Sequence, residues 1–353
     1  MSASNSTVEL QPGPVMVDVE GLSLTEHERQ RLRHPLVGGV ILFARNFRDR
    51  DQLHDLCRQI RLARKAPLLI AVDHEGGRVQ RFRDDGFTHI PSMRRIGTVW
   101  ESDPWLAQRL ACDAGYVMAL ELRACGVDMT FAPVLDLDYG VSTVIGDRAF
   151  HHDPQVVTSL ARALAHGLAL AGMGACGKHF PGHGAVRADS HHEIPVDERQ
   201  RDEIISTDAA PYAWLGDLAL PSVMPAHVIY PNVDVHPAGF SRVWLQEILR
   251  GDLAYDGVVF SDDLTMEGAT VAGDILARAQ AALQAGCDMV LVCNRPDMAD
   301  DLLGRLQFEP DAASVQRIRC LIPTSPCPDR NALQSDKRYQ DARQRLRSET
   351  LSG

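Results

Sequence analysis

The chain has 353 residues, of which 45% are hydrophobic and 24% are charged, a composition typical of one large globular domain or two smaller ones. Its formal net charge of -11 argues against nucleic acid or an anionic membrane surface as a partner, because phosphate groups attract basic surfaces. Residues 1–14 lack the features of a secretory signal, and no run approaches the roughly 20 apolar residues that span a bilayer. We therefore expect a cytoplasmic protein that acts on a small molecule.

The eight cysteines are scattered along the chain, and none belongs to a Cys-x-x-Cys pair. Most lie in apolar segments, where a thiol behaves as a small buried hydrophobe. This pattern indicates a reducing compartment without a thiolate zinc site. We expect no cofactor and no bound metal.

After a flexible N-terminal segment (1–14), short apolar runs alternate with polar loops and helical patterns. The runs are nearly continuous in apolar character, as expected for parallel strands that are covered on both faces. Eight such runs predict a single (β/α)8 barrel over residues 15–323. A doubly wound open sheet is the alternative, but no Gly-x-Gly-x-x-Gly follows the first run. The predicted strands are Val15–Val19, Val37–Phe43, Leu68–Val72, Met129–Leu137, Ala175–Lys178, Ser222–Ala226, Gly257–Phe260 and Met289–Cys293.

Three of the intervening helices have clear boundaries or faces. Apolar residues at helical spacing between 106 and 118 predict the first, and Asp153 followed by Pro154 predicts the start of the second. Ser241 is positioned to cap the third, with Gly251 beyond its end. Residues 324–353 predict a surface helix or a loose tail, and we find no second core.

Polar side chains gather where the predicted strands end. In a barrel, the carboxyl ends of the strands form the face that carries the active site. One such residue is often only the cap of the next helix, but charged residues from several strands are harder to explain in that way. The residues at these strand ends are Asp73, His74, Asp136, Asp138, Lys178, His179, His227, Asp262, Asp263 and Asn294.

The stretch 178–193 contains four histidines, two carboxylates and a lysine. Pro181, Gly182 and Gly184 predict a strand that opens into a long polar loop. Asp189 and His191 are two residues apart, so the carboxylate could orient the imidazole as in the hydrolase triads. An imidazole has an ordinary pKa near 6.5, which suits proton transfer near neutral pH.

Two further groups are candidates for chemistry. Asp262 follows an apolar strand directly and could act as a nucleophile or as an electrostatic stabiliser. Asp263 could instead cap a helix that begins near Leu264, and the residues alone leave the choice between the two carboxylates open. Arg81, Arg148 and Lys178 could hold an oxygen-rich ligand.

Five motifs in order along the chain resemble glycoside hydrolase family 3, and in particular its bacterial β-N-acetylglucosaminidases. They are VDHEGGRVQRF, GDRAF, KHFPGHG, DSHHEIP and GVVFSDDLTMEGA, and the resemblance extends from about residue 15 to 300. It implies a retaining β-glycosidase in which Asp262 is the nucleophile and His191, assisted by Asp189, is the acid/base. The sugar-binding residues that it implies are Asp73, Arg81, Arg148, Lys178 and His179.

The resemblance also implies a substrate and a biological role. The substrate is a terminal β-linked N-acetylglucosamine on 1,6-anhydro-N-acetylmuramic acid, with or without stem peptide, and the role is peptidoglycan recycling. We expect a monomer that completes its own site. The chain departs from the family pattern at His74, where glutamine is expected, and at Ala185-Val186-Arg187, where Asp-Thr is common, and we expect local effects only.

Two alternative functions are compatible with the same residues. A metal-dependent barrel hydrolase would use His179, His183, His191, His192 and Asp262 as ligands. A non-catalytic sugar-binding protein would tolerate changes at Asp262 and His191.

Overall fold

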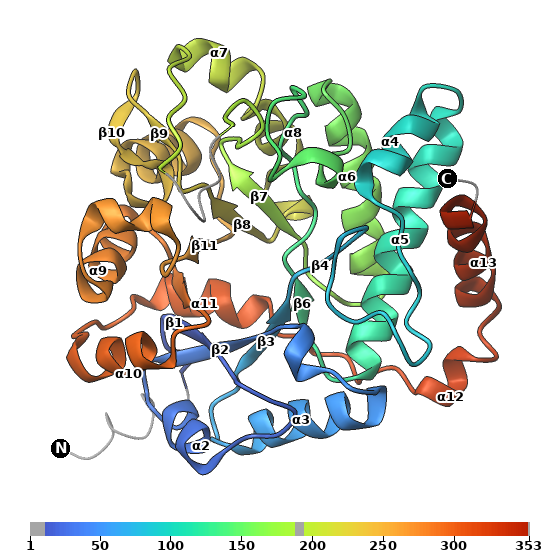
Figure 1. Cartoon of the computed structure of the whole chain (residues 1–353), viewed down its shortest axis with the longest axis horizontal. Helices are drawn as coiled ribbons and strands as arrows, with labels where there is room; N and C mark the ends of the chain where they lie inside the picture. The colour runs from blue at the N-terminus through green and yellow to red at the C-terminus, as the bar shows by residue number, and fades with distance from the viewer. Residues whose placement is uncertain (1–10, 188–193, 352–353) are drawn as a thin grey trace.

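A closed barrel of parallel strands lies at the centre of the computed structural model, which describes residues 11–187 and 194–351 (Figure 1). Its strands run in the order β6-β3-β2-β1-β12-β11-β8-β7, and all are paired in parallel. Parallel bridges from Met129 to Gly174 and from Val134 to Lys178 join the two end strands. The strands are β1 (Val15–Asp18), β2 (Val37–Leu42), β3 (Leu69–Val72), β6 (Met129–Thr130), β7 (Cys176–Phe180), β8 (Ser222–Pro225), β11 (Val258–Asp263) and β12 (Met289–Val292).

The predicted barrel is therefore confirmed, and the doubly wound sheet is wrong because an open sheet would leave two unpaired edges. Each of the eight predicted runs overlaps one strand of the barrel, and β7 and β11 extend beyond their runs to Phe180 and Asp263. The run 129–137 contains only the two-residue strand β6. Pro133 has no amide hydrogen to donate, and proline therefore interrupts a ladder of strand hydrogen bonds.

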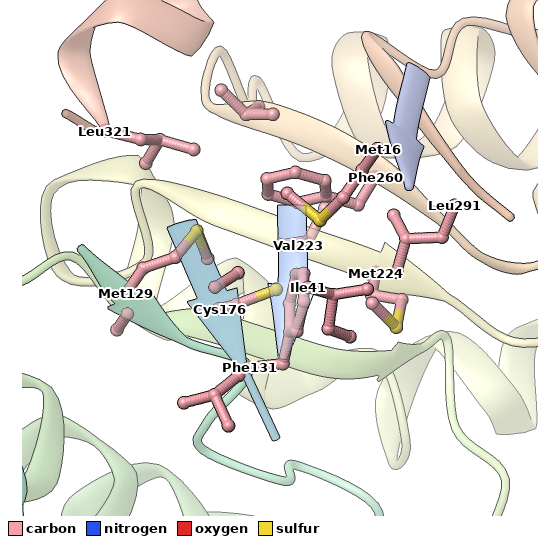
Figure 2. Close-up of a cluster of buried hydrophobic side chains, with 14 of the residues drawn as sticks. Met16, Ile41, Met129, Phe131, Cys176, Val223, Met224, Phe260, Leu291 and Leu321 are labelled. Atoms are coloured by element: carbon pink, nitrogen blue, oxygen red, sulfur yellow. The ribbon is translucent and has the colours of Figure 1, made fainter. Parts of the chain in front are cut away.

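Apolar side chains from several strands fill the interior of the barrel, as Figure 2 shows for one cluster. Met16, Met129 and Cys176 are fully buried in it. The rings of Phe131 and Phe260 meet edge to face with centroids 5.2 Å apart. The interior of the barrel is thus a packed core.

Helices surround the barrel and connect its strands (Figure 1). None of the helices within 11–187 and 194–351 combines the length and the apolar character needed to cross a membrane. The principal ones are α2 (Glu26–Leu32), α3 (Arg50–Leu62), α4 (Met93–Trp100), α5 (Pro104–Ala124), α6 (Pro154–Leu170), α7 (Arg201–Ser206), α8 (Ala210–Ala219), η4 (Val243–Asp252), α9 (Ile275–Ala285), α10 (Pro296–Arg305), α11 (Ala312–Cys320), α12 (Arg330–Leu333) and α13 (Lys337–Leu351).

Two of the three predicted helices are confirmed, and the third differs at its end. The Asp153 carboxylate accepts a hydrogen bond from the Gln155 amide at 2.8 Å, and Pro154 is the first residue of α6. The Ser241 hydroxyl accepts from the Trp244 amide at 3.1 Å, but η4 is a π-helix that includes Gly251. Its wider hydrogen bonds, such as the one from the Leu253 amide to the Ile248 carbonyl, carry the helix past the glycine.

The helix α13 packs beside α5 on one side of the barrel (Figure 1). Tyr339, Ala342 and Leu346 are fully buried in this contact. The Tyr339 hydroxyl donates to a Glu121 carboxylate oxygen at 2.7 Å. The contact therefore combines apolar burial with a buried polar anchor.

Helices α5 and α6 approach each other closely through two glycines. A β-carbon added to Gly115 would lie 2.1 Å from the Leu164 carbonyl oxygen, and one added to Gly167 would lie 2.1 Å from the Cys112 carbonyl oxygen. Real β-carbons do not approach backbone atoms so closely, so the helix spacing depends on these two glycines.

Replacement of Gly167 with alanine should therefore separate α5 from α6 and lower the free energy of unfolding by about 1–3 kcal/mol. Gly304 in α10 is the matched control, because a β-carbon there meets nothing within 4 Å. Gly304→Ala should leave stability unchanged or raise it by roughly 0.5–1 kcal/mol through helix propensity. Urea unfolding of both variants checks this, and equal shifts would contradict the packing argument.

Candidate active site

A cavity of about 340 Å³ lies at the carboxyl ends of the barrel strands. Its size suits a small ligand such as one sugar ring. It contains the six sequence-assigned site residues that the structure describes, namely Asp73, Arg81, Arg148, Lys178, His179 and Asp262. Asp189 and His191 lie outside the described residues.

Five charged groups form an ionic network on the wall of the cavity. The Lys178 ammonium lies 2.7 Å from a carboxylate oxygen of Asp73 and 2.7 Å from one of Glu75. The Arg148 guanidinium donates a hydrogen bond to each carboxylate oxygen of Glu75 at 2.8 Å, in the bidentate geometry that a guanidinium favours. Arg81 completes the network at 3.5 Å from Asp73.

This network keeps Glu75 and Lys178 charged although both are buried. Burial by itself would raise the pKa of the Glu75 carboxyl, but Arg148 and Lys178 hold that pKa well below its ordinary value. Burial would likewise lower the pKa of Lys178, but Asp73 and Glu75 raise it above the ordinary value. The cavity therefore presents fixed charges to a polar ligand.

Glu75 is a member of the site that the sequence analysis did not assign. Side chains alternate along an extended chain, so Asp73 and Glu75 face the same side and His74 faces the other. The short strand β4 (His74–Gly76) has this extended geometry. The spacing of Asp73 and Glu75 was the signal that could have identified Glu75.

The same alternation explains His74, which replaces the expected glutamine. Its ring is 1% exposed and contacts the rings of Phe82 and Phe87 at centroid distances of 5.8 and 5.9 Å. Burial lowers its pKa to about 3, so the imidazole is neutral. This departure from the family pattern therefore lies behind the cavity wall and not within the cavity.

Asp262 and Asp263 both line the cavity at the end of β11, but the Asp263 side chain is bound within the protein. Its carboxylate accepts hydrogen bonds from the Thr265 amide at 3.0 Å, the Thr265 hydroxyl at 2.7 Å and the Cys293 amide at 3.1 Å. These bonds stabilise a turn, so the expected helix cap near Leu264 is wrong. The next helical segment, η5, begins only at Glu267.

The Asp263 carboxyl should also give the protein a pH-dependent stability. Burial raises its pKa to about 6, against 3.8 in an unfolded chain. Between these values the folded state keeps a proton that the unfolded state releases, so stability should fall as the pH rises from about 4 to 6. Asp263→Asn removes the buried charge and should gain on the order of 2 kcal/mol at pH 8 and far less at pH 4.5. Urea unfolding at both pH values tests this, and the same difference at both would contradict it.

The remaining strand-end residues divide into two groups. Asn294 lines the cavity, whereas Asp136, Asp138 and His227 do not. Asp138 pairs with Arg94 and accepts a hydrogen bond from the Gly140 amide at 2.8 Å. His227 is fully buried, and its Nε2 lies 3.1 Å from the Asp263 carbonyl oxygen. Asp138 and His227 thus make their contacts within the protein, outside the cavity.

The metal-site alternative rests partly on His191 and His192, which lie outside the described residues. Within the described residues, no group of three or more His, Cys, Asp or Glu side chains is arranged to hold a metal ion. His179 directs its Nδ1 at Asp136, 2.7 Å away.

The chain matches a known protein family and named relatives over almost its whole length. The family description "Glycosyl hydrolase family 3 N terminal domain" matches residues 13–318. A protein named beta-hexosaminidase from Bordetella parapertussis is 72% identical over 344 residues, which are 98% of this chain and 97% of that protein. Its namesake from Bordetella avium is 71% identical over 353 residues, which are 100% of both chains.

Solved structures show the same barrel. NagZ from Neisseria gonorrhoeae in complex with N-trifluoroacetyl-D-glucosamine superposes with a TM-score of 0.91 at 46% identity, over 97% of this chain and 99% of that one. The same protein in complex with a zinc ion superposes with a TM-score of 0.90 at 45% identity, over 97% and 99% of the two chains. The chain therefore belongs to glycosyl hydrolase family 3 and is a glycoside hydrolase.

Proposed function

We propose that this protein is a retaining exo-β-N-acetylglucosaminidase that removes terminal β-1,4-linked N-acetylglucosamine from 1,6-anhydro-N-acetylmuramic acid muropeptides in peptidoglycan recycling. The main support is the cavity, which places Asp262 beside the ionic network of Asp73, Glu75, Arg148 and Lys178. The beta-hexosaminidase relatives and the glucosamine derivative in the Neisseria protein favour an N-acetylhexosamine substrate. We further propose a cytoplasmic monomer that needs no cofactor or metal.

The ionic network suits the binding of a sugar ring. Each sugar hydroxyl both donates and accepts a hydrogen bond, and the network supplies cationic donors next to carboxylate acceptors. Because the network is already paired within the protein, its side chains do not need to reorganise when the sugar binds. Arg81, Arg148, Lys178 and Asp73 would then fix the ring in one orientation.

Asp262 would perform the covalent step. Its carboxylate oxygen attacks the anomeric carbon as the glycosidic bond to the leaving oxygen breaks, which forms a glycosyl-enzyme ester. The Asp263 amide donates to Asp262 Oδ1 at 2.8 Å and orients the carboxylate. Water then hydrolyses the ester with a second inversion, so that the anomeric configuration is retained overall.

His191, assisted by Asp189, would transfer the protons. In the first step its imidazolium protonates the leaving oxygen, and in the second its neutral form accepts a proton from the attacking water. Most glycosidases use a second carboxylic acid for this task. An imidazole suits it here because its ordinary pKa lies near neutral pH.

The direct test is turnover of 4-nitrophenyl β-N-acetylglucosaminide beside the matching β-glucoside. We expect hydrolysis of the first only, and release of N-acetylglucosamine from the disaccharide with 1,6-anhydro-N-acetylmuramic acid. A chelator should leave the rate unchanged. Loss of activity on chelation, restored by zinc, would favour the metal-dependent hydrolase instead. Tight binding of N-acetylglucosamine without any turnover would favour the sugar-binding protein.

A further inference from the structure

Asp136 is a buried carboxylate that the proposed mechanism does not use. It is 0% exposed and lies beyond the end of β6, behind the wall of the cavity. Its Oδ2 is 2.7 Å from His179 Nδ1, and its Oδ1 accepts from the His183 amide at 2.6 Å and from the His179 amide at 3.2 Å. One carboxylate thus contacts the ring and the amide of His179, which lies in β7, and the amide of His183, just beyond that strand.

The contact determines which nitrogen of His179 carries a proton. Burial by itself would raise the pKa of the Asp136 carboxyl, but His179 and the amide donors hold it below its ordinary value. An ionised carboxylate can only accept hydrogen bonds, so Nδ1 of His179 must be the donor. The other ring nitrogen, Nε2, is then the one available to the cavity that His179 lines.

We propose that Asp136 is a positioning residue for sugar binding, which keeps a proton on His179 Nδ1 and thereby leaves Nε2 to accept a hydrogen bond from a substrate hydroxyl. This inference rests on the proposed function. The cations Lys178, Arg81 and Arg148 donate hydrogen bonds, and a hydroxyl that accepts from one of them still has its own proton to donate. Nε2 of His179 is the acceptor that we propose for that proton.

The variant Asp136→Asn separates this role from support of the backbone. An asparagine oxygen can still accept from the His183 amide, while its NH₂ group faces His179 Nδ1 and must donate to it. The ring must then accept at Nδ1 and carry its proton on Nε2, so the cavity gains a donor where it had an acceptor. Asp138→Asn is the matched control, because Asp138 lies two residues away and contacts Arg94 outside the cavity.

We expect Asp136→Asn to lower kcat/KM by about 10–100-fold, the effect of losing one well-placed hydrogen bond to the substrate. Asp138→Asn should change it less than about threefold. In a His179→Gln background the further change from Asp136 to Asn should have little effect, because the imidazole that it orients is gone. An equal loss in both backgrounds would show that Asp136 only supports the backbone, and would overturn the proposal.

Nitrogen NMR of ¹⁵N-histidine-labelled protein reads the tautomer directly, with His179 assigned from the His179→Gln spectrum. We expect the proton on Nδ1 in the wild type and on Nε2 in Asp136→Asn. A wild-type signal with the proton on Nε2 would overturn the proposal whether or not any variant folds. If the tautomers behave as expected but the wild type hydrolyses no β-N-acetylglucosaminide, the proposed function fails while Asp136 still sets the tautomer of His179.

Discussion

Replacement of Asp262 with alanine is expected to lower kcat by about 10⁴-fold or more, because the covalent step loses its nucleophile. The fold should persist, since the carboxylate lies at the mouth of the barrel and outside its packed core. The measurement is steady-state hydrolysis of 4-nitrophenyl β-N-acetylglucosaminide, with melting temperatures recorded beside it.

Two controls make this result specific. Asp263→Asn changes the adjacent carboxylate and should keep kcat within about tenfold, because its hydrogen bonds to Thr265 and Cys293 are structural. Azide should restore turnover of an activated substrate by Asp262→Ala and yield the α-glycosyl azide, since the anion enters where the carboxylate was. If Asp263→Asn lost activity and Asp262→Ala kept it, the two roles would be reversed.

Replacement of Lys178 with methionine should destabilise the protein and prevent productive binding of the sugar. The side chain of Lys178 is 3% exposed and bridges Asp73 and Glu75 at 2.7 Å. Its removal leaves two neighbouring carboxylates with one fewer cation, which we expect to cost about 3 kcal/mol of unfolding free energy. The fall in kcat/KM should reach about 10³-fold, because the orientation of the sugar is lost as well.

Lys65→Met is the matched control for this variant. Lys65 is exposed, and the same change there removes one positive charge without disturbing a buried ion pair. It should shift stability by less than about 0.5 kcal/mol. Thermal and urea unfolding of the two variants, with kinetics at saturating and limiting substrate, give the comparison. Equal stability of Lys178→Met and the wild type would show that the network does not depend on its lysine.

The barrel could be predicted from the sequence because its strands are buried on both faces and are therefore continuously apolar. Because the apolar runs show where the strands end, the sequence also predicted that Asp73, Lys178 and Asp262 lie at strand ends. The structure brings these three residues into one cavity. Glu75 could also have been predicted from the sequence, because it lies two residues from Asp73 on the same side of an extended chain. In these cases a local pattern carried the structural information.

Other features depend on contacts between distant segments. The pairing of Asp136 with His179 spans 43 positions and exists because the barrel closes between β6 and β7. The hydrogen bond from the Cys293 amide to Asp263 joins neighbouring strands in the same way. The π-helical geometry of η4 carried that helix past Gly251, where a glycine commonly ends an α-helix. None of these contacts leaves a periodic signal in the sequence.

The proposed mechanism depends most on a covalent bond between the sugar and Asp262. A 5-fluoro N-acetylglucosaminyl fluoride slows both steps by destabilising the cationic transition state, while the good leaving group still permits the first, so the intermediate should accumulate. Digestion and mass spectrometry should then find one N-acetylhexosamine-derived adduct, on Asp262. An adduct on Asp263, or rapid turnover of ordinary substrate with inverted product and no adduct, would contradict the proposed mechanism.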